Sequence, residues 1–134
     1  MTSAEEHKII ILHFLDDINE KIRANLLVER QKIIGFSVSE ASTNLLEYFL
    51  HKKNIITSGF RINHNYFASE RRAERYLDFE FPNKKEIIDL MVMIDESRCL
   101  LCYGKEKKEE LIREAISILI KIKEIIETEL GEKI

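Results

Sequence analysis

Apolar side chains recur at intervals of three or four residues along most of this chain. In its first part the recurring positions are Ile11, Leu15, Ile18, Ile22 and Leu26, with charged side chains between them. This spacing places the apolar residues on one face of an α-helix. Because such a face is stable only when it is buried against other elements, the pattern predicts a protein of packed helices.

The apolar stripes and their flanking residues predict four long helices, two of them in the N-terminal part. The first covers about residues 3–29. The second begins after Gly35, with Ser37 or Ser39 as its N-cap, since a hydroxyl can accept a hydrogen bond from a free backbone N–H group. We expect this second helix to end near Lys53.

The third helix has the clearest start. Asn83 is the expected N-cap, and Glu86 lies three residues further on, as in a capping box. The helix is expected to end at Tyr103. Gly104 then follows in the left-handed conformation that commonly closes a helix.

A fourth helix follows a short charged link and carries an apolar stripe over residues 111–126. Short links make neighbouring helices antiparallel. Between the second and third helices, residues 57–82 hold six of the eleven aromatic residues, and we expect a short helix over residues 69–77 within them. The predicted fold class is therefore all-α, an antiparallel four-helix bundle with an aromatic-rich insertion between helices 2 and 3.

Composition agrees with this class and restricts the function. The 134 residues fit a single domain, residues 1–134, and one proline and four glycines are too few for a many-stranded β protein. The net charge of −3 means that any contact with nucleic acid requires a local basic patch. No apolar run approaches the roughly 20 residues that span a membrane. With two cysteines and no signal-peptide start, we expect a cytoplasmic protein without membrane contact.

Three segments resemble the HEPN superfamily of small helical bundles, which are often encoded beside nucleotidyltransferases. They are the helix from Ser39 to Lys53, the helix end from Arg98 to Gly104, and the closing helix. The resemblance implies a homodimer that interacts with RNA or a nucleotide, with a nucleotidyltransferase as partner in a toxin–antitoxin pair. Family members that cleave RNA do so without a metal, using an arginine and, a few residues later, a histidine on the third long helix.

Arg98 matches that arginine, whereas Tyr103 stands at the position of the histidine. Tyrosine, with a pKa of about 10, is protonated at neutral pH and is a poor general base. Tyr103 could instead stack on a base or donate a hydrogen bond, and Arg98 could bind a phosphate. We therefore expect binding rather than catalysis here, any activity being that of a metal-independent endoribonuclease. The structural alternative is an ion pair between Arg98 and Asp95.

The aromatic-rich insertion contains a histidine, His64, that could replace the missing one if the insertion folds over Arg98. The alternative is a solvated loop histidine. The same region carries eight cationic and only four anionic side chains between positions 51 and 85. Arginines interleaved with aromatic residues suit single-stranded RNA or a nucleotide, although helix-surface ion pairs are the alternative. These arginines are Arg61, Arg71, Arg72 and Arg75.

Two other functions stay open. One is a non-catalytic oligomerisation or protein-interaction bundle. The other is a magnesium-dependent nucleotide pyrophosphohydrolase, which would need Glu86 and Asp89 to converge with Glu70 or Glu74.

The cysteines Cys99 and Cys102 have C-x-x-C spacing. They lie near the end of a predicted helix, where the helix dipole opposes thiolate formation, so we expect two buried thiols rather than a redox site. No motif has complete metal-ligand spacing, and we expect neither a bound metal nor a cofactor.

Overall fold

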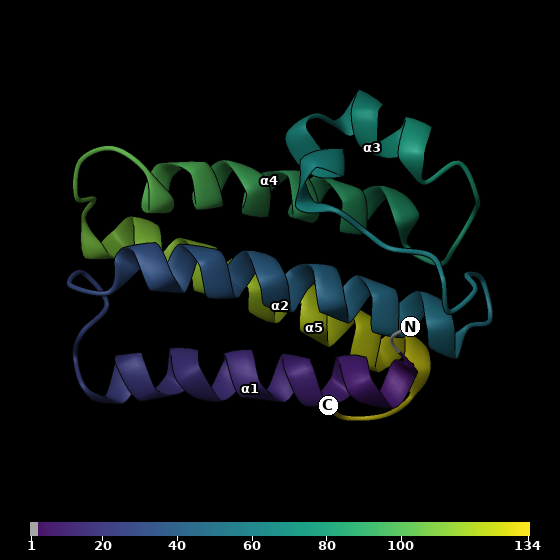
Figure 1. The fold of residues 1–134 in the computed structure, drawn as a ribbon, viewed down its shortest axis with the longest axis horizontal. Helices are drawn as coiled ribbons and strands as arrows, with labels where there is room; N and C mark the ends of the chain where they lie inside the picture. The colour runs from purple at the N-terminus through teal and green to yellow at the C-terminus, as the bar shows by residue number, and fades with distance from the viewer. Residues whose placement is uncertain (1–2) are drawn as a thin grey trace.

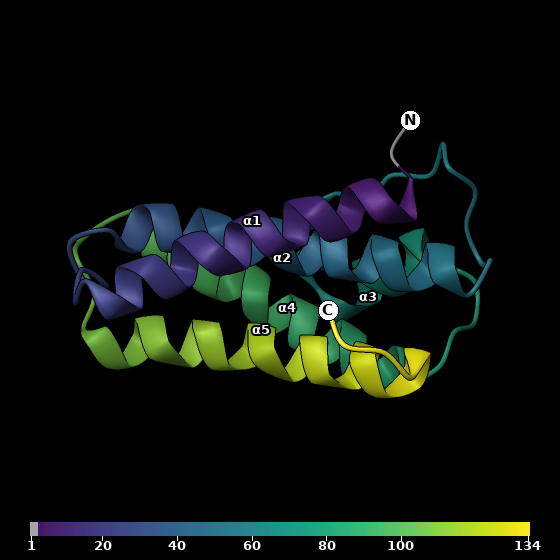
Figure 2. The ribbon, with the colours of Figure 1, turned by 90° about the horizontal axis from the view of Figure 1, so that it is seen from below.

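The computed structural model describes residues 3–134, which form five α-helices and one short 3-10 helix, with no strand among them. The all-α prediction is confirmed. Four long helices lie side by side (Figures 1 and 2): α1 (Ala4–Arg23), α2 (Gln31–Lys52), α4 (Lys84–Cys102) and α5 (Glu109–Leu130). The 3-10 helix η1 (His64–Ala68) and the short α3 (Glu70–Tyr76) pack beside α4. None of the helices within this described range is long and apolar enough to cross a membrane.

Helix α2 lies at the centre of the structure and contacts α1, α4 and α5 (Figures 1 and 2). Most of its residues are buried, including small polar ones such as Ser42. A helix with neighbours on several sides must be apolar or small around most of its circumference. In contrast, α1 and α5 bury one stripe each and expose charged side chains on the opposite face.

Helix α1 ends earlier than the prediction of about residue 29. Asn25 adopts a left-handed conformation with φ of 57°, which a helix cannot continue through. The N–H groups of Asn25 and Leu26 donate to the carbonyls of Ile22 and Lys21 at 3.1 and 2.9 Å, the two bonds of a Schellman motif. The apolar residue Leu26 therefore continues the stripe in sequence but lies outside the helix.

Helix α2 begins at Gln31, so the prediction of a start after Gly35 is wrong. Ser37 and Ser39 are buried within the helix and are not N-caps. Gly35 lies at a close approach between helices, because a Cβ atom built on it would lie 2.9 Å from Leu101 Cβ on α4. The glycine allows this close packing and does not mark a helix boundary.

The predicted start of the helix that the structure labels α4 is correct in position but not in mechanism. Asn83 is the N-cap residue, but it is left-handed with φ of 59° and its side chain makes no capping bond. Instead, its amide donates to Glu129 on α5 at 2.8 Å, and no capping box with Glu86 forms. At the other end α4 stops at Cys102, and Gly104 has the expected positive φ of 77°.

The segment between α2 and α4 contains the predicted short helix, α3. Ser69 is its N-cap, and its hydroxyl accepts a hydrogen bond from the Arg72 N–H at 3.0 Å. Aromatic side chains pack this segment against the long helices. Phe81 contacts the Phe49 ring of α2 with centroids 6.4 Å apart, and Phe79 contacts both Phe60 and Phe81.

Replacement of Gly35 by alanine tests the close approach of α2 and α4. An added methyl group would overpack the contact with Leu101, at a typical cost of about 1–3 kcal/mol, against about 1 kcal/mol gained from helix propensity. We expect Gly35→Ala to lower the melting temperature by a few degrees in calorimetry. The control is Gly59→Ala, where a Cβ would meet no atom within 4 Å. An equal or higher melting temperature for Gly35→Ala would contradict the close contact.

Candidate functional site

Arg98 lies in the last part of α4 and is engaged on two sides. Its Nε donates to Asp95 Oδ1 at 3.4 Å, and its side chain is 17% exposed. Burial lowers the pKa of Arg98, but hydrogen bonding to the Tyr103 side chain and the nearby Asp95 carboxylate outweigh burial and raise it. The guanidinium is therefore a permanent cation. The structure contains the alternative ion pair of Arg98 with Asp95, and it places the Tyr103 side chain next to the same guanidinium.

His64 begins η1 and lies beside the same carboxylate. Its Nδ1 is 3.4 Å from Asp95 Oδ1, the oxygen that also accepts from Arg98. An ionised carboxylate next to Nδ1 favours the tautomer that carries its proton there, which leaves the Nε2 lone pair available. The segment between α2 and α4 thus brings His64 to the Asp95 carboxylate of α4, where a histidine, a carboxylate and an arginine meet.

The three arginines of α3 are exposed, and their side chains form no ion pair with any residue in the range 3–134. Arg72 and Arg75 lie over the Tyr76 ring, with their guanidinium carbons 5.7 and 5.3 Å from its centroid. The Tyr66 ring stacks on Tyr76 at a centroid distance of 4.2 Å. The helix-surface ion pairs that were the alternative for Arg71 and its neighbours do not form. We call Arg71, Arg72, Arg75, Tyr66 and Tyr76 the arginine–tyrosine platform.

This platform is connected to the neighbourhood of His64 and Arg98 through η1, which contacts both α3 and α4. Tyr66 belongs to η1, and its hydroxyl donates to the Arg61 carbonyl at 3.5 Å. The platform and His64 therefore both adjoin η1, and Asp95 links His64 to Arg98. Of the sequence-predicted residues, Arg61 is exposed and lines a different hollow, described below.

Three of the four carboxylates proposed for a magnesium site, all but Glu86, are paired with lysines. Lys85 lies 3.1 Å from Glu70 and 3.7 Å from Asp89, and Lys84 lies 3.2 Å from Glu74. Across residues 3–134 no group of three or more His, Cys, Asp or Glu side chains is placed to hold a metal ion.

The two cysteines are unpaired with each other, and only one of them is partly buried. Cys102 Sγ donates to the Lys32 carbonyl at 3.4 Å, and burial raises the pKa of this thiol. Cys99 is exposed, so the prediction of two buried thiols is wrong for this residue. The reason is that Cys99 lies on the outer side of α4, where the Arg98 guanidinium is 3.8 Å from its sulfur.

The sequence analysis missed a buried cluster around His7 of α1, which is 2% exposed. His7 Nε2 lies 2.8 Å from Glu47 Oε2, and Nδ1 lies 2.8 Å from Asn44 Oδ1. The Asn44 amide nitrogen donates to the Glu40 carbonyl, which fixes the amide oxygen towards His7. Because both ring nitrogens face acceptors, the surroundings of His7 favour its imidazolium form.

Glu47 also accepts a hydrogen bond from the backbone N–H of Ile62 at 2.7 Å. This bond fixes the segment that carries Arg61 and His64. A signal for the cluster was present in the sequence, since Glu47 is the one charged residue in the otherwise uncharged run from Ala41 to Leu50. A lone acid in such a run indicates a buried, paired carboxylate.

The protonation of His7 results from opposing effects. Burial lowers its pKa, but the hydrogen bonds with Glu47 and Asn44 outweigh burial, so that the net pKa is raised. His51 stacks on His7 with ring centroids 5.4 Å apart, and its Nε2 is buried without a partner in the described part of the chain. Burial and the charge of His7 lower the pKa of His51. The pKa values of the two stacked rings are therefore shifted in opposite directions, that of His7 upwards and that of His51 downwards.

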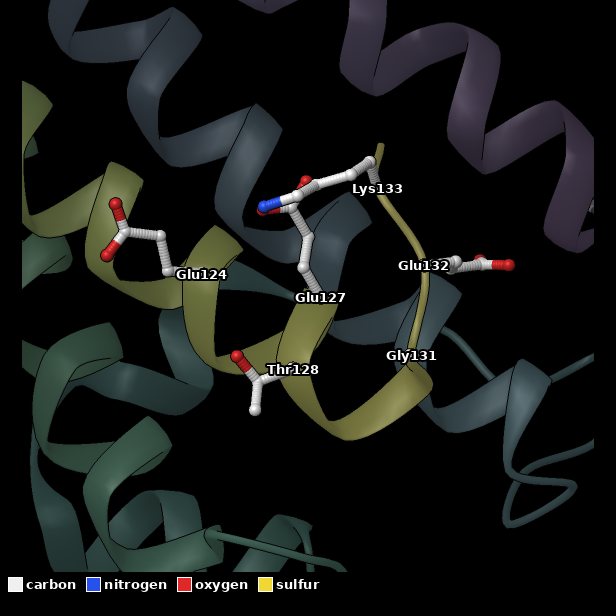
Figure 3. A pocket seen from close by; sticks show the side chains of 6 residues that line it. All are labelled: Glu124, Glu127, Thr128, Gly131, Glu132 and Lys133. Carbon is white, nitrogen blue, oxygen red and sulfur yellow. The ribbon is translucent and has the colours of Figure 1, made fainter.

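Two hollows bear on the choice of site. The larger, about 540 Å³, lies at the end of α5 and is lined by Glu124, Glu127, Glu132 and Lys133 (Figure 3). Glu127 is already satisfied by Lys123 and by the Ile134 N–H group. A second hollow of about 400 Å³ is lined by α1, α2 and the segment 61–64. This second hollow borders the His7 cluster and His64.

No family model, curated protein or solved structure matches the chain. The functional argument therefore depends on the residues and contacts described above.

A titration of the histidine rings by NMR tests the buried cluster. We expect the His7 ring to titrate above the ordinary value of about 6.5 and the His51 ring below it. In Glu47→Gln, which removes the carboxylate but keeps its shape, the His7 midpoint should fall.

The ion pair between His7 and Glu47 also contributes to the free energy of unfolding. Since the folded-state pKa of His7 is raised, its contribution is complete below about pH 6.5 and is lost as the pH rises through the folded value. A His7 midpoint that is unchanged in Glu47→Gln would contradict the pairing.

Proposed function

We propose that this chain is an antiparallel four-helix bundle of the HEPN type that binds single-stranded RNA or nucleotides. The aromatic-rich insertion would supply much of the binding face, and the bundle would act as the helical partner of a nucleotidyltransferase. The family assignment is supported by the sequence resemblance and by Gly104, which closes the helix end of Arg98 and Tyr103 in a left-handed conformation.

The arginine–tyrosine platform is the observation that carries the proposal. Its three arginines form no ion pair within residues 3–134, although acids lie beside them in the sequence. Phosphates bind to such cations, and unpaired bases stack on aromatic rings or on guanidinium planes. Tyr76 is 40% exposed, with Tyr66 stacked on its ring and Arg72 and Arg75 lying over it, so a base would stack on these guanidinium planes rather than on the ring itself. A strand can therefore gain both backbone and base contacts on α3.

His64, Asp95 and Arg98 form the part of the same region whose side chains could take part in RNA cleavage. A neutral His64 ring oriented by Asp95 could accept the proton of a ribose 2′-hydroxyl, and Arg98 could stabilise charge on the phosphate. Both side chains, however, are already held by one carboxylate, and Tyr103 does not replace the histidine as a base. Binding is therefore the proposed function, and metal-independent cleavage would require His64.

Binding of fluorescent single-stranded RNA, followed by anisotropy at several salt concentrations, tests the proposal. We expect the double variant Arg72→Ala/Arg75→Ala to bind single-stranded RNA of every base sequence more weakly than the wild type does. The slope of log K against log salt should be smaller by about 1.4, since each phosphate contact on a single strand contributes about 0.7. The matched control is Arg23→Ala, an exposed arginine at the end of α1.

Salt-insensitive binding, or equal loss in Arg23→Ala, would contradict the platform. The same RNA analysed on a gel shows whether it is cleaved. If cleavage occurs, it should be lost in both His64→Ala and Arg98→Ala and should persist in a metal chelator.

Oligomerisation is the second candidate function, and it is favoured by exposed apolar residues near the start of α2. Ile33 and Phe36 are 50% and 49% exposed, and the Phe14 ring of α1 packs edge-on against Phe36 at 6.2 Å. Large exposed apolar side chains that adjoin one another commonly mark interfaces. A second copy of this chain, as in the homodimer that the HEPN resemblance implies, would bury them.

Sedimentation velocity tests this candidate. We expect the wild type to sediment as a dimer and Ile33→Ser/Phe36→Ser as a monomer with unchanged helicity. Ile120→Ser, which alters a residue of α5 that is 39% exposed, should leave the dimer intact. A wild type that is monomeric at all concentrations would exclude self-association through this face.

A further inference from the structure

The hollow between α1, α2 and the segment 61–64 has the features of a ligand site that the platform does not include. Its volume of about 400 Å³ lies in the range of small-molecule pockets. Its walls combine apolar side chains, Ile10 and Phe14, with the polar side chains of Glu40, Arg61 and His64. Most of the residues that line it are polar, so it suits a ligand that has several polar groups and one apolar face.

The inner wall of this hollow is rigid because its charged groups are buried and paired. His7 and Glu47, both more than nine-tenths buried, line the hollow and bind each other at 2.8 Å. Glu47 also holds the Ile62 N–H, so the backbone between Arg61 and Asn63 is fixed against α2. The positions of the outer residues are thus determined before a ligand arrives, which reduces the cost of binding.

The outer wall carries polar groups that remain available. The Arg61 side chain forms no hydrogen bond or ion pair within the described range, and it is exposed. The carboxylate of Glu40 is also without a bonded partner there, because the bonds from Thr43 and Asn44 go to its backbone carbonyl. His64 uses Nδ1 for Asp95 and leaves Nε2 without a bonded partner in the same range. A cation, an acceptor and a histidine nitrogen therefore line one hollow.

We infer that this hollow binds one nucleotide unit. Arg61 binds its phosphate, the Glu40 carboxylate and the His64 Nε2 lone pair accept hydrogen bonds from ribose hydroxyls, and the base lies against Phe14 and Ile10. Repulsion between the Glu40 carboxylate and a phosphate sets the direction of the ligand. A zwitterionic amino acid could pair with Arg61 and Glu40, but a typical one would leave much of the volume and the apolar wall empty.

This inference deepens the proposed function, because it assigns a separate site to a single nucleotide, which arrives free or as part of a strand bound on the platform. The common chemistry of both sources is a nucleoside monophosphate. Tyr66 of the platform donates to the Arg61 carbonyl, so the two sites are neighbours. A strand on α3 could thus place one nucleotide in the hollow.

The test is a titration of the full chain, followed by the amide signals of Asn44, Ile62 and His64 in NMR. The probes are 5′-AMP and 5′-UMP, with inorganic phosphate, adenosine and phenylalanine as comparisons. We expect both mononucleotides to shift these signals with saturation, and Arg61→Ala to weaken binding about tenfold, as for the loss of one charge-assisted contact. Glu40→Gln should reduce the preference for 5′-AMP over its 2′-deoxy analogue. Arg23→Ala, at an exposed position at the end of α1, should leave mononucleotide binding unchanged.

The outcomes separate this inference from the proposed function. Absence of saturable shifts with both mononucleotides, or equal binding of phosphate or phenylalanine, would overturn the nucleotide site even if RNA still binds to the platform. Mononucleotide binding that depends on Arg61, together with no RNA binding, would support the hollow and overturn the platform. If Arg61→Ala weakens RNA binding, the hollow takes up one nucleotide of a bound RNA strand. If RNA binding is unchanged in Arg61→Ala, the hollow binds a free mononucleotide.

Discussion

The buried carboxylate of Glu47 links three parts of the chain that are far apart in sequence. It binds His7 of α1 at 2.8 Å and the backbone of Ile62 at 2.7 Å, while its own residue lies in the central helix α2. Removing one partner of a buried ion pair typically costs about 3–5 kcal/mol, because the remaining charge stays buried without compensation. The positions of α1, α2 and the segment around Ile62 are therefore coupled. Arg61 and His64, on either side of Ile62, obtain their positions from this one carboxylate.

Helix α2 determines the other side of the proposed binding region as well. At Gly35 its backbone approaches α4 so closely that a Cβ would lie 2.9 Å from Leu101, three residues after Arg98. Packing of Gly35 against Leu101 thus positions the part of α4 that carries Arg98. The hydrogen bond from the Ile62 N–H to Glu47 positions the segment that carries His64. Asp95 then joins the two, since both side chains lie 3.4 Å from the same oxygen. Helix α2 thus contacts both the element that carries His64 and the helix that carries Arg98.

The sequence predicted features that depend on neighbouring residues and missed those that depend on distant ones. Helical spacing predicted the long helices, local turn chemistry predicted the left-handed Gly104, and a short helix was expected at the place of α3. The start of α2 was wrong because Gly35 serves a contact with α4, which local sequence cannot show. The His7 cluster was missed for the same reason, since Glu47 lies forty residues from its partner. His64 was predicted as a site residue only if the segment between the second and third long helices folded over Arg98. Such a tertiary contact cannot be predicted from local sequence.

The pairing of charges around α3 follows a pattern that stability does not explain. Its acids, Glu70 and Glu74, bind Lys85 and Lys84 of α4, while the arginines of the same helix remain without ion pairs within residues 3–134. Exposed ion pairs contribute at most about 1 kcal/mol, so exchanging one cation for another would change the folded state little. The pattern does change the surface, because the lysines neutralise the acids that would otherwise compete for the arginines. In a chain of net charge −3, this pairing keeps a cationic, aromatic face on α3, as binding to a phosphate-bearing ligand requires.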